Sequence, residues 1–164
     1  MSKEIQFKKI QVQKAVFNIG EEISWLRTSS QQVGGIATFL GVVRDINEDD
    51  SVSGLYLEHY PGMTESQIEK IIYEAGKRWE VITVTVIHRI GELLPNDEIV
   101  FVGVGSTHRG DAFAACEFIM DYLKTKATFW KKEQTVDGSR WLTTRPSDVK
   151  AAERWQSSKG DDLS

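Results

Sequence analysis

Several basic side chains lie at the end of an apolar run, just before the sequence changes to a turn or to a new element. A basic residue at such a position can bind an anion. Arg44 ends an apolar run and precedes a polar, acidic stretch. Its planar guanidinium can hold a phosphate or a carboxylate through two hydrogen bonds. An arginine at the end of a strand is more often simply solvated, so Arg44 taken alone does not indicate a site.

His108 and Arg109 follow another apolar run and precede a helical pattern. Unpaired backbone N–H groups and the helix dipole favour an anion at such a position. A histidine there can also exchange protons near neutral pH. A purely structural role, in which the pair only hydrogen-bonds the turn, fits the sequence about equally well.

Lys124 and Lys131 lie seven residues apart, about two turns of a helix, so an unbroken helix would place them on one side. Tyr122, Phe129 and Trp130 offer partly apolar surroundings. Removal from water lowers the pKa of a lysine from about 10.4 and makes its amine usable as a base or nucleophile. Helix lysines more often face solvent, so the pattern is suggestive but not specific.

The remaining histidines and the cysteine favour structural roles. His88 falls on the apolar face of a predicted strand, which is typical of a core histidine. His59 stands beside Glu58, but no second His or Cys has metal-ligand spacing, so we predict no metal site. Cys116 falls on a predicted buried helix face, where a thiol is usually inert. The chain has no phosphate-binding loop of the Walker type, no GxGxxG and no GxSxG.

The elements that must position these residues centre on the segment from Ser106 to Glu133. Its larger apolar residues recur at alternating gaps of three and four, which predicts one long helix with a single buried face. They are Phe113, Cys116, Met120, Leu123, Ala127 and Trp130.

Before this segment we predict a strand within residues 3–17, a short helix over Glu21–Arg27, and strands over Gly34–Arg44 and Val52–Tyr60. The two later strands are expected to form a hairpin around a flexible acidic loop. Thr64 and Gln67 resemble a capping box that opens a helix. That helix is expected to bury four apolar residues, namely Ile68, Ile71, Ile72 and Ala75.

Two more strands are predicted over Val81–Ile90 and Glu98–Ser106, followed later by a hairpin at Asp137-Gly138. Ser147 with Asp148 can cap a last helix that reaches Trp155. The order β-β-α-β-β-α-β-β-α predicts an α+β fold and not a doubly wound parallel sheet. We expect one domain over residues 1–156 and a disordered tail over 157–164.

Composition indicates a cytoplasmic protein with no nucleic-acid or membrane partner. The chain has 164 residues, a net charge of −4 and a single cysteine. A nucleic-acid binder usually has a basic footprint, and a membrane span needs about 20 apolar residues, neither of which the sequence offers. The N-terminus lacks the apolar core of a signal peptide. Any anion site must therefore arise from a local cluster of cations.

Five stretches, in order over residues 34–155, closely resemble the large, catalytic subunit of molybdopterin synthase. They are TFLGVVRD (38–45), LEHYPGMTE (57–65), VTVIHRIGEL (84–93), DEIVFVGVGSTHR (97–109) and FIMDYLKTKATFWKKE (118–133). Strings of this length are far more specific than a three-residue motif.

The resemblance implies sulfur transfer in molybdenum cofactor synthesis. In that family cyclic pyranopterin monophosphate receives two sulfurs and becomes molybdopterin, with no further cofactor. The sulfur is carried as a thiocarboxylate on the C-terminal Gly-Gly of a small ubiquitin-like subunit. The large subunit is expected to be a homodimer within a heterotetramer, with an α/β hammerhead fold and an additional antiparallel β subdomain.

The resemblance also implies which residues contact substrate. They are Val42, Val43, Arg44, His108, Arg109, Lys124, Lys131, Lys132 and Glu133, and Arg145 matches an arginine that is thought to reach the site from the neighbouring subunit. Arg44 and the His108-Arg109 pair would hold the phosphate and pterin. Lys124 would assist attack by the thiocarboxylate sulfur, and Lys131 would secure the carrier's C-terminal carboxylate or a substrate oxygen.

Two alternatives from other classes remain open at this point. A module that only docks a ubiquitin-like protein would bind the carrier tail without needing Lys124 or His108. A persulfide relay through Cys116 would need an exposed thiol with a low pKa.

Overall fold

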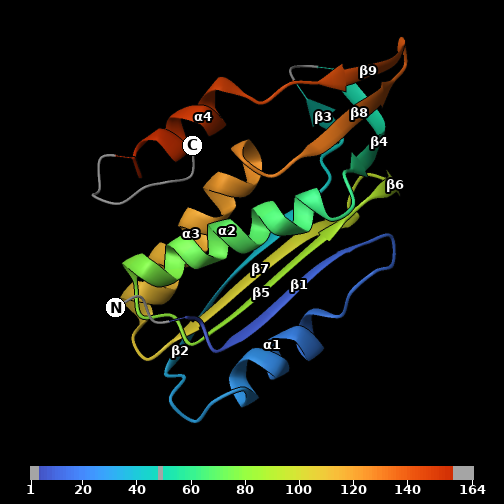
Figure 1. Ribbon diagram of the computed structural model, residues 1–164. Helices are drawn as coiled ribbons and strands as arrows, with labels where there is room; N and C mark the ends of the chain where they lie inside the picture. The colour runs from blue at the N-terminus through green and yellow to red at the C-terminus, as the bar shows by residue number, and fades with distance from the viewer. Residues whose placement is uncertain (1–3, 48–49, 157–164) are drawn as a thin grey trace.

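The computed structural model describes residues 4–47 and 50–156, which build two β-sheets and four helices (Figure 1). The first sheet has four strands in the order β1 (Phe7–Gln13), β5 (Thr83–Arg89), β7 (Glu98–Ser106) and β2 (Gly35–Val42). β1 runs parallel to β5, and the other pairs are antiparallel. These strands match those expected from the sequence.

Helices cover both faces of this sheet. Figure 1 shows α2 (Met63–Arg78) and α3 (Arg109–Thr125) on one face and α1 (Ile19–Thr28) on the other. The central strands β5 and β7 are therefore buried almost along their whole length. Burial on both faces explains why β7 is a nearly continuous apolar run after Glu98.

The main core lies between this sheet and the two helices α2 and α3. The four α2 residues predicted to be buried, Ile68, Ile71, Ile72 and Ala75, have no exposed surface. Each buried large aliphatic side chain contributes about 1.5–3 kcal/mol to folding, so this face fixes α2 firmly on the sheet.

The second sheet is antiparallel and contains the strands that follow α3. Its order is β3 (Ile46–Asn47), β4 (Asp50–His59), β8 (Phe129–Thr135) and β9 (Gly138–Leu142), with β6 (Gly91–Leu93) also pairing with β4. The predicted α+β class with an additional antiparallel sheet is thereby confirmed. The interpretation of residues 1–156 as one domain stays a prediction.

The last helix, α4 (Pro146–Glu153), packs on α3. It begins at Pro146 with Arg145 as its N-cap, and Ser147 does not cap it as expected. Trp155 follows the helix and packs edge-on against Phe118. In the described part of the chain, no helix is both long and apolar enough to cross a membrane.

The long helix predicted through Glu133 is wrong in its second half, because α3 ends at Thr125. The following backbone is held by α2 instead. The N–H of Thr128 donates to Oε1 of Gln67 at 2.7 Å, and its carbonyl accepts from Oγ1 of Thr64 at 2.8 Å. The supposed capping-box pair thus anchors the chain before β8, while Glu65 caps α2 by accepting from the N–H of Gly62.

The predicted buried face of α3 is only partly correct. Cys116, Met120 and Leu123 are buried as expected, but Phe113 is 65% exposed. The helix instead buries Phe118 and other residues of the neighbouring face against the sheet. The spacing of apolar residues in the sequence did not show that the buried surface of α3 extends to the face that carries Phe118.

The expected hairpin between Gly34–Arg44 and Val52–Tyr60 is also wrong. β2 pairs with β7 in the first sheet, whereas β4 pairs with β3, β6 and β8 in the second. The acidic stretch contains the short β3–β4 ladder, and residues 48–49 within it are outside the described part. The hairpin at Asp137-Gly138 is confirmed, with Thr135 opposite Gly138 at its end. The predicted tail over 157–164 also lies outside the described residues.

Candidate functional site

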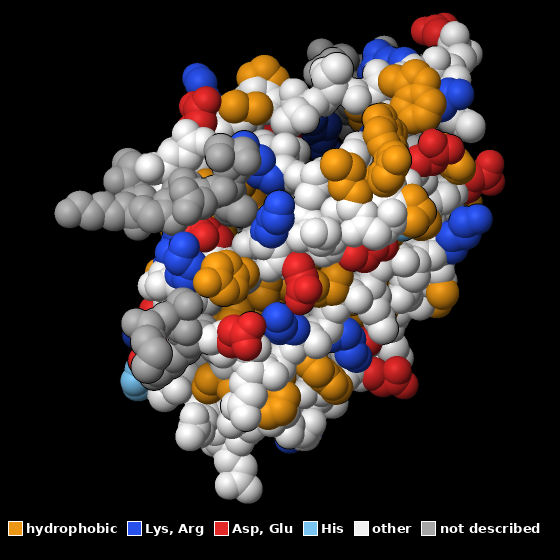
Figure 2. Space-filling view, viewed as in Figure 1, with side chains coloured by type: hydrophobic (Ala, Val, Ile, Leu, Met, Phe, Trp, Pro, Cys, Tyr) orange, Lys and Arg blue, Asp and Glu red, His pale blue; other side chains and the backbone are white. Residues whose placement is uncertain are grey.

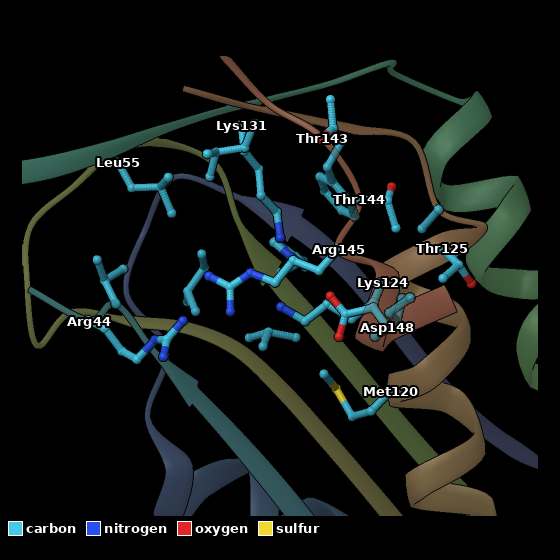
Figure 3. A pocket seen from close by; sticks show the side chains of 18 of the residues that line it. Arg44, Leu55, Met120, Lys124, Thr125, Lys131, Thr143, Thr144, Arg145 and Asp148 are labelled. Carbon is cyan, nitrogen blue, oxygen red and sulfur yellow. The ribbon is translucent and has the colours of Figure 1, made fainter. Parts of the chain in front are cut away.

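A cavity of about 270 Å³ lies where the two sheets meet near the C-terminal end of α3. Four cationic side chains, Arg44, Lys124, Lys131 and Arg145, line it, together with the carboxylate of Asp148. Figure 3 shows these side chains converging from separate elements. The local cluster of cations expected from the sequence therefore exists in a chain whose net charge is −4.

A bulge at the end of β2 brings Arg44 to the cavity. The register between β2 and β7 shifts between Gly41 and Val42. A Cβ atom at Gly41 would lie 2.5 Å from Cγ1 of Val100, so this close approach requires glycine. Because a bulge re-aims the residues that follow it, Val42, Val43 and Arg44 all line the cavity.

The alternation of β8 decides which of its charged residues face the cavity. Lys131 and Glu133 line it, whereas Lys132 lies on the opposite face, as alternate residues of a strand do. The ammonium of Lys132 sits 5.5 Å from the ring centroid of Trp141. Lys132 is therefore not brought to the cavity in this structure.

The environment of Lys131 changes its protonation. Burial lowers the pKa of Lys131 to about 7, and the charge of Lys124 and a hydrogen bond with it add to the effect. The cation of Arg145 acts in the same direction, while Asp148 opposes it. Near neutral pH the Lys131 amine is thus present in both charge states, which suits proton exchange or reversible anion binding.

Glu133 is anchored by a partner on the neighbouring strand. Its side chain is almost fully buried, and its Oε2 accepts from Nη2 of Arg140 at 3.2 Å. The carboxylate contributes negative charge to the cavity wall and ties β8 to β9.

His108 and Arg109 are not brought to the cavity within one chain. They stand at the N-terminal end of α3, whereas Lys124 stands in its last turn. Sixteen residues at 1.5 Å each separate His108 from Lys124 by about 24 Å along the helix. His108 is the N-cap residue of α3, yet its side chain makes no capping hydrogen bond.

Cys116 has the properties of a packing thiol. It is buried, its Sγ donates to the carbonyl of Val102 at 3.8 Å, and burial raises its pKa to about 12. A persulfide relay needs an accessible thiolate, so this environment argues against that alternative. Across residues 4–47 and 50–156, no group of three His, Cys, Asp or Glu side chains is arranged to bind a metal ion.

Two titratable residues that line the cavity, His88 and Asp148, were not among the site residues predicted from the sequence. His88 was interpreted as a core residue, and it is buried, but one side of it lines the cavity. Asp148 was considered only as part of a helix cap. Arg145 and Asp148 lie three residues apart where α4 begins, a spacing that places two side chains on one side of a helix and could have revealed the pair.

Comparison with known proteins gives consistent results. The MoaE protein family matches residues 12–126. The chain is 56% identical over 147 residues to the molybdopterin synthase catalytic subunit of Escherichia coli (strain K12), which covers 90% of this chain and 97% of the relative. Identity to the corresponding subunit of Ralstonia nicotianae is 56% over 146 residues, covering 89% and 83%. The structure of the molybdopterin biosynthesis MoaE protein from Burkholderia ambifaria aligns with a TM-score of 0.79 at 48% identity, covering 93% of this chain and 100% of that one.

Proposed function

Because this chain belongs to the MoaE family of molybdopterin synthase catalytic subunits, we propose that it transfers two sulfur atoms to cyclic pyranopterin monophosphate and so forms molybdopterin. A small ubiquitin-like subunit supplies each sulfur as a thiocarboxylate at its C-terminal Gly-Gly. The observation that carries the proposal is the cavity lined by four cations, which can receive both an anionic substrate and an anionic carrier tail.

The arginines bind the substrate phosphate. Arg44 and Arg145 enter the cavity from different elements, and each guanidinium can donate two parallel hydrogen bonds to phosphate oxygens. Because Arg145 lines the cavity of its own chain, we assign it to the phosphate bound there, in place of the expected role in the neighbouring subunit's site. Val42 and Val43 form an apolar part of the wall, against which a pterin ring can pack.

The two lysines serve the sulfur chemistry. Attack of the thiocarboxylate sulfur forms a carbon–sulfur bond on the substrate as a carbon–oxygen bond at the same carbon breaks, and the departing oxygen takes up a proton. Water then hydrolyses the resulting thioester, which leaves the sulfur on the substrate as a thiolate and releases the carrier with a C-terminal carboxylate. Lys124 assists the attack by transferring a proton or by stabilising developing negative charge. Lys131 secures the carrier's carboxylate through its ammonium form.

A second copy of the chain completes the site. About 24 Å of helix separates His108 from Lys124, so His108 and Arg109 do not line the cavity of their own chain. In a homodimer the same pair can face the cavity of the other copy and contribute to phosphate and pterin binding. One carrier subunit on each large subunit then makes a heterotetramer.

The test is a reconstituted reaction that contains this protein, a thiocarboxylated carrier and cyclic pyranopterin monophosphate, with the dithiolene product followed. Lys124→Ala is expected to abolish turnover while the dimer stays folded. Lys150→Ala, on the exposed part of α4, is the matched control and should be fully active. Normal turnover by Lys124→Ala would remove the role assigned to Lys124. Carrier binding without product, even for the unmodified protein, would instead favour a docking module.

A further inference from the structure

His88 lies at the end of β5, where the first sheet meets the second. Its imidazole stacks on the ring of Phe129, the first residue of β8, with centroids 3.9 Å apart and planes inclined by 21°. The ring is almost fully buried, and one side of it lines the cavity. The stack fixes the orientation of the imidazole relative to the strand that carries Lys131.

Hydrogen bonding determines which nitrogen of His88 carries the proton. Nδ1 lies 2.8 Å from the carbonyl oxygen of Arg89. A carbonyl only accepts, so Nδ1 donates, and Nε2 of the neutral ring keeps a free lone pair. Within the described part of the chain, no group donates a hydrogen bond to Nε2.

The surroundings keep this ring uncharged. Burial lowers the pKa of His88 to about 3, against the opposing hydrogen bond to the Arg89 carbonyl, and the nearby Lys131, Lys124 and His59 lower it further. A group with so low a pKa is a poor base near neutral pH, since it holds a proton too weakly. It remains a good hydrogen-bond acceptor.

We propose that His88 is a binding residue whose Nε2 accepts a hydrogen bond from an N–H group of a molecule bound in the cavity. The arginines and lysines of the cavity donate when charged, and Glu133 and Asp148 accept but carry charge that repels a phosphate. His88 supplies an uncharged acceptor beside them. This inference rests on the proposed function, which brings two molecules with N–H groups to the site, the pterin and the Gly-Gly tail of the carrier.

Two substitutions separate this role from simple packing. His88→Phe keeps an aromatic ring against Phe129 but removes the acceptor. His88→Gln can place its amide oxygen near the position of Nε2 and so restores an acceptor without the ring. Thr85→Val, on the opposite face of β5 and buried beneath α1, controls for general disturbance of the strand.

For each variant we would measure KM and kcat with cyclic pyranopterin monophosphate, the Kd of the carrier, and the melting temperature. Loss of one buried hydrogen bond should weaken binding by about 5–10-fold in His88→Phe, whereas His88→Gln should stay within about twofold of the unmodified protein. A raised KM for the pyranopterin identifies the pterin as the donor, and a raised Kd for the carrier identifies the tail amide.

Unchanged binding of both molecules to His88→Phe would overturn the proposal. Equal loss of binding in the Phe and Gln variants, together with an equal fall in melting temperature, would also overturn the proposal. That outcome would indicate that His88 only packs against its neighbours. If the unmodified protein forms no product, the proposed function fails. Calorimetric binding of the pyranopterin and of the carrier to the same variants still decides the role of His88.

Discussion

Lys131 of β8 and Lys124 of α3 share one cavity, close enough for their side chains to hydrogen-bond, although one lies on a strand and the other on a helix. Burial and the neighbouring cation lower the pKa of Lys131 to about 7. Its amine therefore changes charge near neutral pH, whereas an ordinary surface lysine stays charged there.

The first prediction concerns stability. The folded protein loses the proton of Lys131 near pH 7, whereas the unfolded chain keeps it until its ordinary pKa of 10.5. The unfolded state therefore binds more protons between these values, and the free energy of unfolding should rise with pH above 7. The contribution of Lys131 approaches about 1.4 kcal/mol per pH unit. Urea unfolding from pH 6 to 9 should show a steeper rise for the unmodified protein than for Lys131→Met, and equal slopes would contradict the assigned shift.

The second prediction concerns carrier binding. If the ammonium of Lys131 holds the carboxylate of the spent carrier, the Kd of that carrier should increase as the pH rises through 7. Lys131→Arg keeps its charge throughout this range and should show a much weaker pH dependence. Titration of the carrier, with its ordinary C-terminal carboxylate, at pH 6 and pH 8 measures both. A pH-independent Kd for the unmodified protein would argue against this role of Lys131.

Local hydrophobic patterns predicted the secondary-structure elements well where burial of one face determines how a strand or helix packs. The strand over Glu98–Ser106 is confirmed at both ends, and the buried face of α2 is confirmed residue by residue. The pairing of strands was less predictable, because β2 and β4 join different sheets. Such partners depend on contacts between distant segments, which a window of neighbouring residues does not contain.

The arrangement of the site residues likewise depends on contacts between distant segments. Lys124 and Lys131 do share a cavity, but for a different reason from the one predicted. The helix ends before Lys131, and Thr128 is held by donating its N–H to Gln67 and accepting from the hydroxyl of Thr64. The distance between His108 and the cavity depends on where α3 ends, which the sequence did not predict. The sequence therefore singled out cationic residues that do line one cavity, among them Arg44, Lys124 and Lys131, while their arrangement in space required the fold.

The third prediction tests whether two copies build each site. Lys124→Ala and the double variant His108→Ala with Arg109→Ala should each be inactive or nearly so as homodimers. When the two chains are mixed or produced together, one of the two cavities in each mixed dimer regains all its residues. Product formation should then recover to roughly half the normal rate per mixed dimer, a fraction set by the geometry of the dimer. No recovery, with mixed dimers verified by differently tagged chains, would mean that each chain uses only its own residues.

The fourth prediction concerns a buried hydroxyl. Oγ1 of Thr85 is buried and, within the described part of the chain, has no hydrogen-bond partner. Valine has almost the same shape and removes the cost of burying this group. Thr85→Val should therefore raise the free energy of unfolding by about 1 kcal/mol without changing KM. A destabilised variant would indicate that the hydroxyl has a partner, such as a bound water.

The last prediction concerns the bulge that aims Arg44. Alanine at Gly41 would push its Cβ to 2.5 Å from Cγ1 of Val100, so β2 and β7 must separate locally. Overpacking of this kind costs about 1–3 kcal/mol, and the shift moves Arg44 relative to the cavity. Gly41→Ala should accordingly lower stability and also raise KM for the pyranopterin. Gly110→Ala is the matched control, because a Cβ there meets nothing within 4 Å and alanine favours the helix. A Gly41→Ala variant with lowered stability but normal KM would show that Arg44 reaches the substrate independently of the bulge.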